Sequence, residues 1–377
     1  NLDSQGNAGT VTILKYSEGS IDSKGDILYS DFVDATVIAT ASFDLRGNSL
    51  TQTVKRYSDE ALKSLVETQA ITNQGYDFHD RVSRSSIITT NSTGEFVDRQ
   101  EVSYVLYDTF GNAVDQTIER YTETDSLIDY KVIHNEYSSA VAARRGNATH
   151  TTINRYDSKT VLDNTTRTER QEIYNNSFDS IGNVVDQVIE LYVGELLSRK
   201  TVIKNSGISN AGDAANQEIT TYTTNDLGVL IAGEISYQLI TNRSFDSSHN
   251  VMNQKVLTYN NATLSKVLLD VQEVRNTKFD SKGNVLEQTI ATFSGVDAQG
   301  NGTGLLDIKV IKNESLDSQG NAGKVTILKY SSGTIAVNGG AITPGTFVDA
   351  TVITTSSFDL RGNALIQMVK KYSNTLA

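Results

Sequence analysis

Few side chains in this 377-residue sequence have types and spacings that could carry chemistry. The chain has no cysteine, which excludes disulfides, thiolate metal sites and cysteine nucleophiles. No GxSxG, HExxH, Walker or GxGxxG motif occurs. The four histidines, which fall at unrelated positions, are interpreted as surface or turn residues. We therefore expect no catalytic residues, no cofactor-binding residues and no enzyme activity. The histidines are His79, His134, His150 and His249.

One segment has side-chain oxygens spaced as in a calcium loop. They recur at alternate positions from Asp297, through Asn301, and Gly302 holds the sixth position. Asp307 is at the eleventh position, whereas a calcium loop of this kind carries its last acid at the twelfth. The segment is either a calcium site formed by Asp297, Asn301 and Asp307 or an ordinary glycine-rich loop. Calcium is the one cofactor that the sequence suggests.

Charge and hydropathy exclude further classes of partner. The formal net charge is −12, whereas binding to nucleic-acid phosphates needs clustered Lys and Arg. No run of eighteen or more apolar residues occurs, so we expect no membrane-spanning segment. Residue 1 is Asn rather than Met, and we expect the natural gene product to begin before it.

The sequence repeats itself at a long period. LDSQGN at residues 2–7 recurs at 316–321, and VTILKY at 11–16 recurs at 325–330, an offset of 314 residues. The loops that follow these copies differ in sequence and in length by one residue. We interpret residues 1–377 as a single repeat array rather than two or three domains, with a super-repeat over 1–314 and the start of the next over 315–377.

A shorter unit, with the turn pattern Phe-Asp-x-x-Gly-Asn, recurs eleven times, with about nine units in the super-repeat. Asp and Gly suit a tight turn, because Asp accepts backbone N–H groups and Gly tolerates positive φ. The sixth residue after the motif is always Ile or Val, the fourth is usually Gln and the ninth usually Tyr. This alternation predicts a strand, and a second Ile- or Val-containing strand precedes each turn. Each unit is thus predicted to be an antiparallel β-hairpin.

Hairpins in series must bury their apolar faces on one another, because a single hairpin is marginal in water. We predict an all-β fold in which tandem antiparallel hairpins form one continuous coiled or closed sheet: a tube, a spiral shell or a solenoid-like stack. We expect very little helix. The glutamine column could form an amide ladder between stacked units, or each Gln could simply be half-buried. The tyrosines are expected to pack locally rather than to seal a rim.

The turn motif resembles the tyrosine–aspartate (YD) repeats of Rhs and teneurin proteins, with the nearest match at residues 107–112. The resemblance covers about six residues of each unit. It implies hairpins that coil into a large β-sheet shell, which in that family can enclose a toxin or stand on a cell surface. This chain departs from the family pattern, since Asn follows the Gly and Asn-x-x or Thr-x-x precedes the Phe.

Near-copies repeated at two levels favour a structural role. Our leading hypothesis is an extracellular or cell-surface structural protein, a filament, surface fibre or sheath component that self-associates or continues as the same array. One alternative is an adhesin whose variable loops bind a glycan or a protein that the sequence does not identify. Another is an Rhs-like shell that encloses cargo. The candidate binding loops are residues 17–31, 122–126 and 294–304.

Overall fold

The computed structural model describes residues 6–24, 26–246, 248–260, 266–280, 282–317, 320–336, 339–358 and 363–374. The chain forms two compact units. The first unit is Asn1–Lys200 with Asp226–Gly228, and the second is Thr201–Asn225 with Val229–Ala377. The division falls within strand β12 (Leu196–Ile208). The 314-residue super-repeat stays a prediction from sequence.

Almost every element is a strand, as the alternating pattern predicts. The first unit contains β1 (Thr10–Ile21), β2 (Ile27–Phe43), β3 (Ser49–Tyr57), β4 (Leu65–Tyr76), β5 (Val82–Asn91), β6 (Phe96–Tyr107), β7 (Ala113–Tyr121), β8 (Leu127–Glu136), α1 (Ala140–Arg145), β9 (His150–Tyr156), β10 (Arg167–Phe178) and β11 (Val184–Val193). The second contains β13 (Ala214–Thr224), β14 (Leu230–Phe245), β15 (Val251–Tyr259), β16 (Leu268–Phe279), β17 (Val285–Val296), β18 (Gly302–Leu316), β19 (Ala322–Tyr330), β20 (Gly333–Ile335), β21 (Ile342–Pro344), β22 (Phe347–Phe358) and β23 (Ala364–Tyr372).

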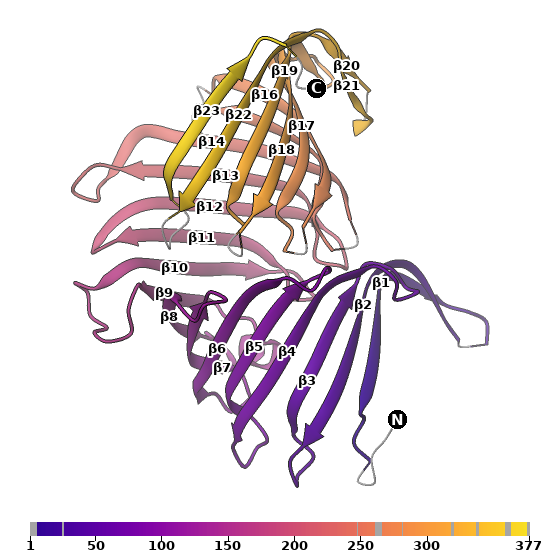
Figure 1. The fold of residues 1–377 in the computed structure, drawn as a ribbon, viewed down its shortest axis with the longest axis vertical. Coiled ribbons are helices and arrows are strands. Elements are labelled where there is room, and N and C mark those ends of the chain that lie inside the picture. Colours follow the sequence, from indigo (N-terminus) through magenta and orange to yellow (C-terminus); the bar gives the residue numbers. More distant parts are fainter. Residues whose placement is uncertain are drawn as a thin grey trace. The chain divides into compact units, whose positions relative to one another are not determined.

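Strands pair with their neighbours in the chain, always antiparallel (Figure 1). In the second unit β20 and β21 form a separate hairpin, and β19 pairs with β22 across it. Among the described registers none joins the first strand of a unit to its last, so each unit is an open sheet. The prediction of an all-β fold of tandem antiparallel hairpins is confirmed, and the sheets are open rather than closed.

The predicted turns form tight hairpin connections. At Asp108–Asn112 the N–H of Asp108 donates to the carbonyl of Asn112 (2.9 Å), and the N–H of Gly111 donates to the carbonyl of Asp108 (3.2 Å). Gly111 has φ +90°, a value that side-chain-bearing residues rarely adopt. This is a type I turn closed by a left-handed residue, a frequent connection for three-residue hairpin loops.

The expectation of very little helix is also confirmed. Helix α1 has six residues and replaces a tight turn between β8 and β9. Ser139 caps its start by accepting from the N–H of Ala142, and Gly146 ends it in the left-handed conformation. No helix in the described ranges is long and apolar enough to cross a membrane.

Burial is modest over most of the sheet and concentrated at one place. The Ile and Val columns face each other across hairpins, as Ile173 faces Ile189, and most of their residues are half-buried. The main buried cluster lies on β16, β17 and β18, where the β20–β21 hairpin covers it with two isoleucines. The cluster consists of Val271, Ala291, Phe293 and Ile308, and the covering residues are Ile335 and Ile342.

Candidate functional site

The recurring Asp of each turn is held by hydrogen bonds from its own turn. One oxygen of Asp108 accepts from the N–H groups of Phe110 (2.8 Å) and Asn112 (2.9 Å), and the other accepts from Asn112 Nδ2 (2.8 Å). Burial alone would raise the pKa of Asp108, but the hydrogen bonds from Asn112 and Phe110 hold it below its ordinary value. The aspartates therefore serve the turns, as the sequence predicts, rather than acid–base chemistry.

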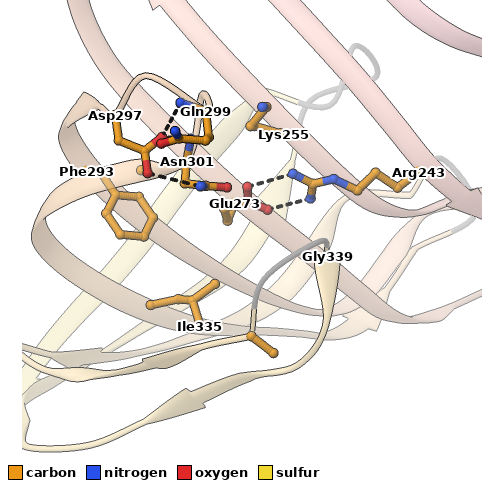
Figure 2. Close-up of a pocket in the computed structure, with 11 residues that line it drawn as sticks. Arg243, Lys255, Glu273, Phe293, Asp297, Gln299, Asn301, Ile335 and Gly339 are labelled. Carbon is orange, nitrogen blue, oxygen red and sulfur yellow. Dashed lines mark hydrogen bonds and ion pairs between the residues drawn. The ribbon is translucent and has the colours of Figure 1, made fainter.

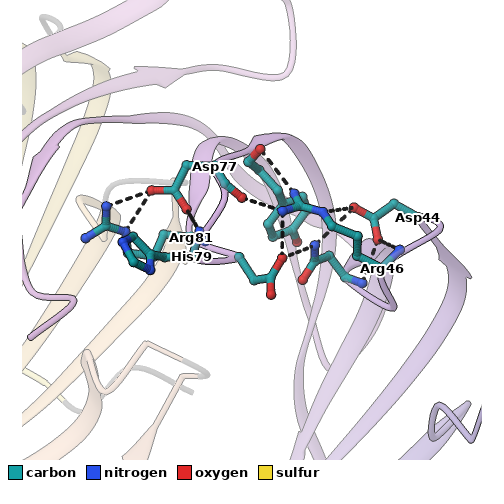
Figure 3. A network of polar contacts seen from close by, with 8 residues as sticks. Asp44, Arg46, Asp77, His79 and Arg81 are labelled. Carbon is teal, nitrogen blue, oxygen red and sulfur yellow. Dashed lines mark hydrogen bonds and ion pairs between the residues drawn. The ribbon is translucent and has the colours of Figure 1, made fainter.

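Successive turns are joined to one another along one end of the first sheet (Figure 3). Arg46 Nη1 donates to the carbonyl of Asp77 in the next turn (2.7 Å) and pairs with Asp80 (3.0 Å). Asn48 Nδ2 also reaches Asp80 (2.9 Å), and Arg81 Nη1 continues the series to the carbonyl of Asp108 (3.0 Å). The turn residues thus link hairpins as well as close them.

A second set of side chains links hairpins on the sheet itself. Asn242 Nδ2 donates to the carbonyl of Ala214, the residue just after the preceding turn (2.9 Å), and Gln254 Nε2 donates to Asn242 Oδ1 (3.0 Å). We call this chain of Gln, Asn and carbonyl the amide relay. The same Asn-to-carbonyl step joins Asn73 to Ser49, Asn135 to Ala113, Asn175 to Ala148, Asn276 to Val251 and Asn313 to Val285.

The residue opposite the relay Asn varies in type, and in most hairpins it donates to the Asn, whereas Val325 lies opposite Asn313. The donor is Gln in several units, whereas Ser85 donates to Asn73 (2.8 Å) and Thr151 donates to Asn135 (2.9 Å). Where Thr40 replaces the Asn, Gln52 still donates to its hydroxyl (3.2 Å). These glutamines therefore bond to the residue opposite them rather than stack as an amide ladder.

The sequence contains a signal for the relay that alternation alone does not explain. The Asn-x-x or Thr-x-x ahead of the motif's Phe marks the relay position, eight residues before the last residue of most turns. The role of the relay Asn depends on which backbone carbonyl of the neighbouring hairpin lies within its reach. The residue spacing within one hairpin does not predict that carbonyl.

The second unit has a cavity of about 450 Å³ beside the β20–β21 hairpin (Figure 2). Arg243 and Glu273 form a bidentate ion pair on its wall (2.6 and 2.8 Å), and Lys255 donates to the carbonyl of Gly300 (3.1 Å). Burial would raise the pKa of Glu273, but Arg243 and Arg275 together hold it below its ordinary value. The cavity therefore combines fixed charges with polar turn residues and can accept a small polar molecule.

The calcium candidates do not converge. Asp297 and Asn301 form another Asp-x-x-Gly-Asn turn: Asp297 accepts from the N–H of Gln299 (2.9 Å) and from the N–H (2.8 Å) and Nδ2 (3.0 Å) of Asn301. Asp307 lies in β18, six residues beyond the last turn residue, Asn301, which is about 20 Å at ~3.3 Å per residue. It faces Lys329 (3.3 Å) instead. Among the described residues no group of three His, Asp or Glu is arranged to hold a metal ion.

The histidines contact carboxylates or turns. His134 Nδ1 lies 2.6 Å from Asp115, His249 Nδ1 lies 2.9 Å from Asp213, and His79 donates its backbone N–H to Asp77 (2.8 Å). His150 lies 2.9 Å from Glu172. His134 and His150 also share a neighbour, Glu136, at 3.9 and 3.3 Å. His79 and His249 belong to turns, whereas His150 is a half-buried residue of strand β9.

A buried ion triad in the first unit was not predicted. Asp129 is 1% exposed, and its carboxylate lies 3.3 Å from Arg120 and 3.2 Å from Arg155. The three residues belong to β7, β8 and β9, so their proximity depends on strand register rather than on spacing in the sequence.

The segments expected to be binding loops are mainly strand and tight turn. Strands β1 and β2 continue to Ile21 and from Ile27, and residues 122–126 form a turn closed by a bond from the N–H of Thr122 to the carbonyl of Ser126 (2.9 Å). Residues 294–304 are the end of the β17–β18 hairpin. Of the three, only the last contributes to the cavity.

Comparison with known proteins leaves the family open. No family model and no curated protein matches the chain. A chain in the crystal structure of TcdB2-TccC3-Cdc42 aligns with a TM-score of 0.19 and 10% identity, over 97% of this chain and 25% of that one. The Tc holotoxin pore of Photorhabdus luminescens with mutated TccC3 gives a TM-score of 0.12 and 10% identity, over 93% and 25%. The chain thus spans a quarter of these chains, and the scores carry no argument about function.

Proposed function

We propose that this protein is a structural, extracellular repeat protein, a component of a filament, surface fibre or sheath. The observation that supports the proposal is the amide relay. In both compact units an Asn at a fixed position joins its hairpin to the one before it, and a Gln, Ser or Thr on the other strand of the same hairpin holds several of these asparagines. Side chains used in this way give a long sheet stiffness along its stacking direction, which a load-bearing array needs.

The proposal implies that copies of the chain associate. Strands at the edge of a sheet present backbone groups that pair with other strands, and β1 and β23 are such edges in the registers described. Sedimentation velocity over a wide concentration range tests this, combined with electron microscopy of the associated material. Elongated assemblies that grow with concentration are expected. A compact monomer of 41.1 kDa at every concentration contradicts the proposal.

The cavity beside β20–β21 favours a second candidate, a binding module. Its polar lining from the β17–β18 turn suits the hydroxyl groups of a glycan, and Gln299 faces it beside Lys255 (Figure 2). Saturation-transfer NMR with a panel of neutral and acidic oligosaccharides tests this role. Binding that Gln299→Ala weakens supports it, and no saturable binding to any member of the panel contradicts it.

A further inference from the structure

Two copies of one strand sequence have different environments in this protein. The sequence VTILKY occurs in β1 and again in β19. In β1, Val11, Ile13 and Leu14 are 40%, 49% and 40% exposed. Their copies in β19, at positions 325, 327 and 328, are all half-buried.

The neighbour that causes the difference is β18. β1 pairs with β2 in the register in which β19 pairs with β22, so that Ile13 faces Thr36 as Ile327 faces Thr351. On its other edge β19 pairs with β18, where Ile311 faces Ile327. The register described for β1 is with β2 alone.

We propose that the outer edge of β1 is a docking edge for an antiparallel strand of the β18 type, supplied by another repeat unit of the same protein. The charge pattern agrees with the apolar pattern. In β18, Asp307 lies 3.3 Å from Lys329, and Lys15 is the copy of Lys329 in β1. A docked β18-type strand therefore brings a carboxylate to Lys15 and half-buries Val11 and Ile13.

The hairpin that follows β1 gives an independent indication of the same partner. Its residues Ile27, Leu28 and Tyr29 are 56%, 55% and 64% exposed. In the second copy the equivalent hairpin, β20–β21, packs Ile335 and Ile342 on the cluster formed by β16, β17 and β18. A β18-type strand that docks on β1 brings with it the neighbouring strands of its own sheet. The end of the β1–β2 hairpin can then cover that sheet as β20–β21 covers β16, β17 and β18.

The other end of the array provides a matched control. β23 is the copy of β3, and β3 pairs with β2 on one edge and with β4 on the other. In β23, Leu365 and Val369 are 64% and 62% exposed. By the same reasoning β23 accepts a β4-type strand, so the two edges select different partners.

Synthetic peptides and the full chain test this assignment, which rests on the proposed function. Hydrogen–deuterium exchange is measured with the β18 peptide (residues 305–316) and with the β4 peptide (residues 65–76). We expect the β18 peptide to protect amides of β1, and the β4 peptide to protect those of β23. A β18 peptide with Val310→Pro loses a ladder donor and should bind about tenfold more weakly or worse.

Protection of neither edge, or equal protection of both edges by either peptide, overturns the assignment. This failure is distinguishable from failure of the proposed function. If the chains associate in sedimentation velocity and the β18 peptide does not compete with this association, the proposed function stands but β1 is not the docking edge. If the chains remain monomeric but the β18 peptide protects β1, the docking edge stands. The self-association that the proposed function requires is then rejected.

Discussion

At the scale of single residues, the hairpin turns depend on one left-handed backbone position, and glycine occupies it in most copies. Gly111 has φ +90°, and a Cβ added there would meet no atom within 4 Å. Because space is not limiting, a substitution at Gly111 isolates backbone strain.

Gly111→Ala should destabilise the protein by about 1–2 kcal/mol, the cost of placing a Cβ in the left-handed region. The control is Gly111→Asn, which should cost less because Asn tolerates this region. Urea unfolding followed by circular dichroism gives both values. An alanine variant as stable as the parent would contradict the turn geometry.

The turn aspartates predict how stability depends on pH. Hydrogen bonds from Asn301 lower the pKa of Asp297 from its ordinary 3.8, and those from the backbone of Arg81 lower that of Asp77. Groups whose pKa is lower in the folded state stabilise it above the unfolded pKa of about 3.9, and this contribution is lost as pH falls through the folded pKa. The urea concentration at the unfolding midpoint should therefore decrease as the pH is lowered below about 4. In Asp297→Asn this decrease should be less steep. An identical acid dependence in that variant would argue against the contribution of Asp297.

At the scale of elements, the amide relay determines how one hairpin holds the next. Asn242 is 6% exposed, so the hydrogen bonds that its amide makes are shielded from water. Three of the relay asparagines, Asn175, Asn242 and Asn276, lie opposite a Gln, just before a bulge in the register. In these hairpins the side-chain contact of the relay therefore lies next to a bulge of the strand.

Asn242→Leu should cost about 1–3 kcal/mol, because it removes the partner of the half-buried Gln254 side chain and of the carbonyl of the half-buried Ala214. Asn242→Thr is the matched control, since the chain itself places Thr40 at this position. The threonine variant should lose less stability, because its hydroxyl can still accept from Gln254. Equal urea midpoints for the leucine and threonine variants would show that the relay does not stabilise the fold.

Because the β20–β21 hairpin covers only part of β18, one isoleucine of this strand should contribute more to stability than another. Ile308 is 0% exposed in the cluster with Phe293, whereas Ile311 on the same strand is half-buried. Ile308→Ala should therefore cost about 2–5 kcal/mol and Ile311→Ala clearly less. Thermal unfolding of both variants provides the comparison, and a larger loss for Ile311→Ala would contradict the assigned core.

Sequence reasoning located the hairpins because turn chemistry and strand alternation are both local. It did not recognise Asp297–Asn301 as a further turn of the same kind, although the Asp-x-x-Gly-Asn pattern is present there. The relay Asn was visible but had no assigned partner, because Asn242 and Ala214 are 28 residues apart. The Asp129 triad and the β20–β21 cover also depend on register and on contacts between distant segments, which periodicity does not contain.

At the scale of the whole molecule, net charge opposes the association that we propose. A chain with a formal charge of −12 repels its own copies, and salt screens that repulsion. The screening length falls from about 30 Å at 0.01 M to about 8 Å at 0.15 M salt. Assemblies should therefore grow with ionic strength over this range in light scattering, with sodium and potassium chloride equally effective. Dissociation by salt would point to ion pairs as the main contact and against strand pairing.

The amide relay also bears on the order in which the protein is made. In each copy the donating Asn comes later in the chain than the carbonyl that accepts from it, as Asn276 comes after Val251. A hairpin that emerges from the ribosome therefore meets an acceptor that the preceding hairpin has already positioned. Synthesis and folding can then proceed in the same direction, one hairpin at a time, without waiting for distant sequence.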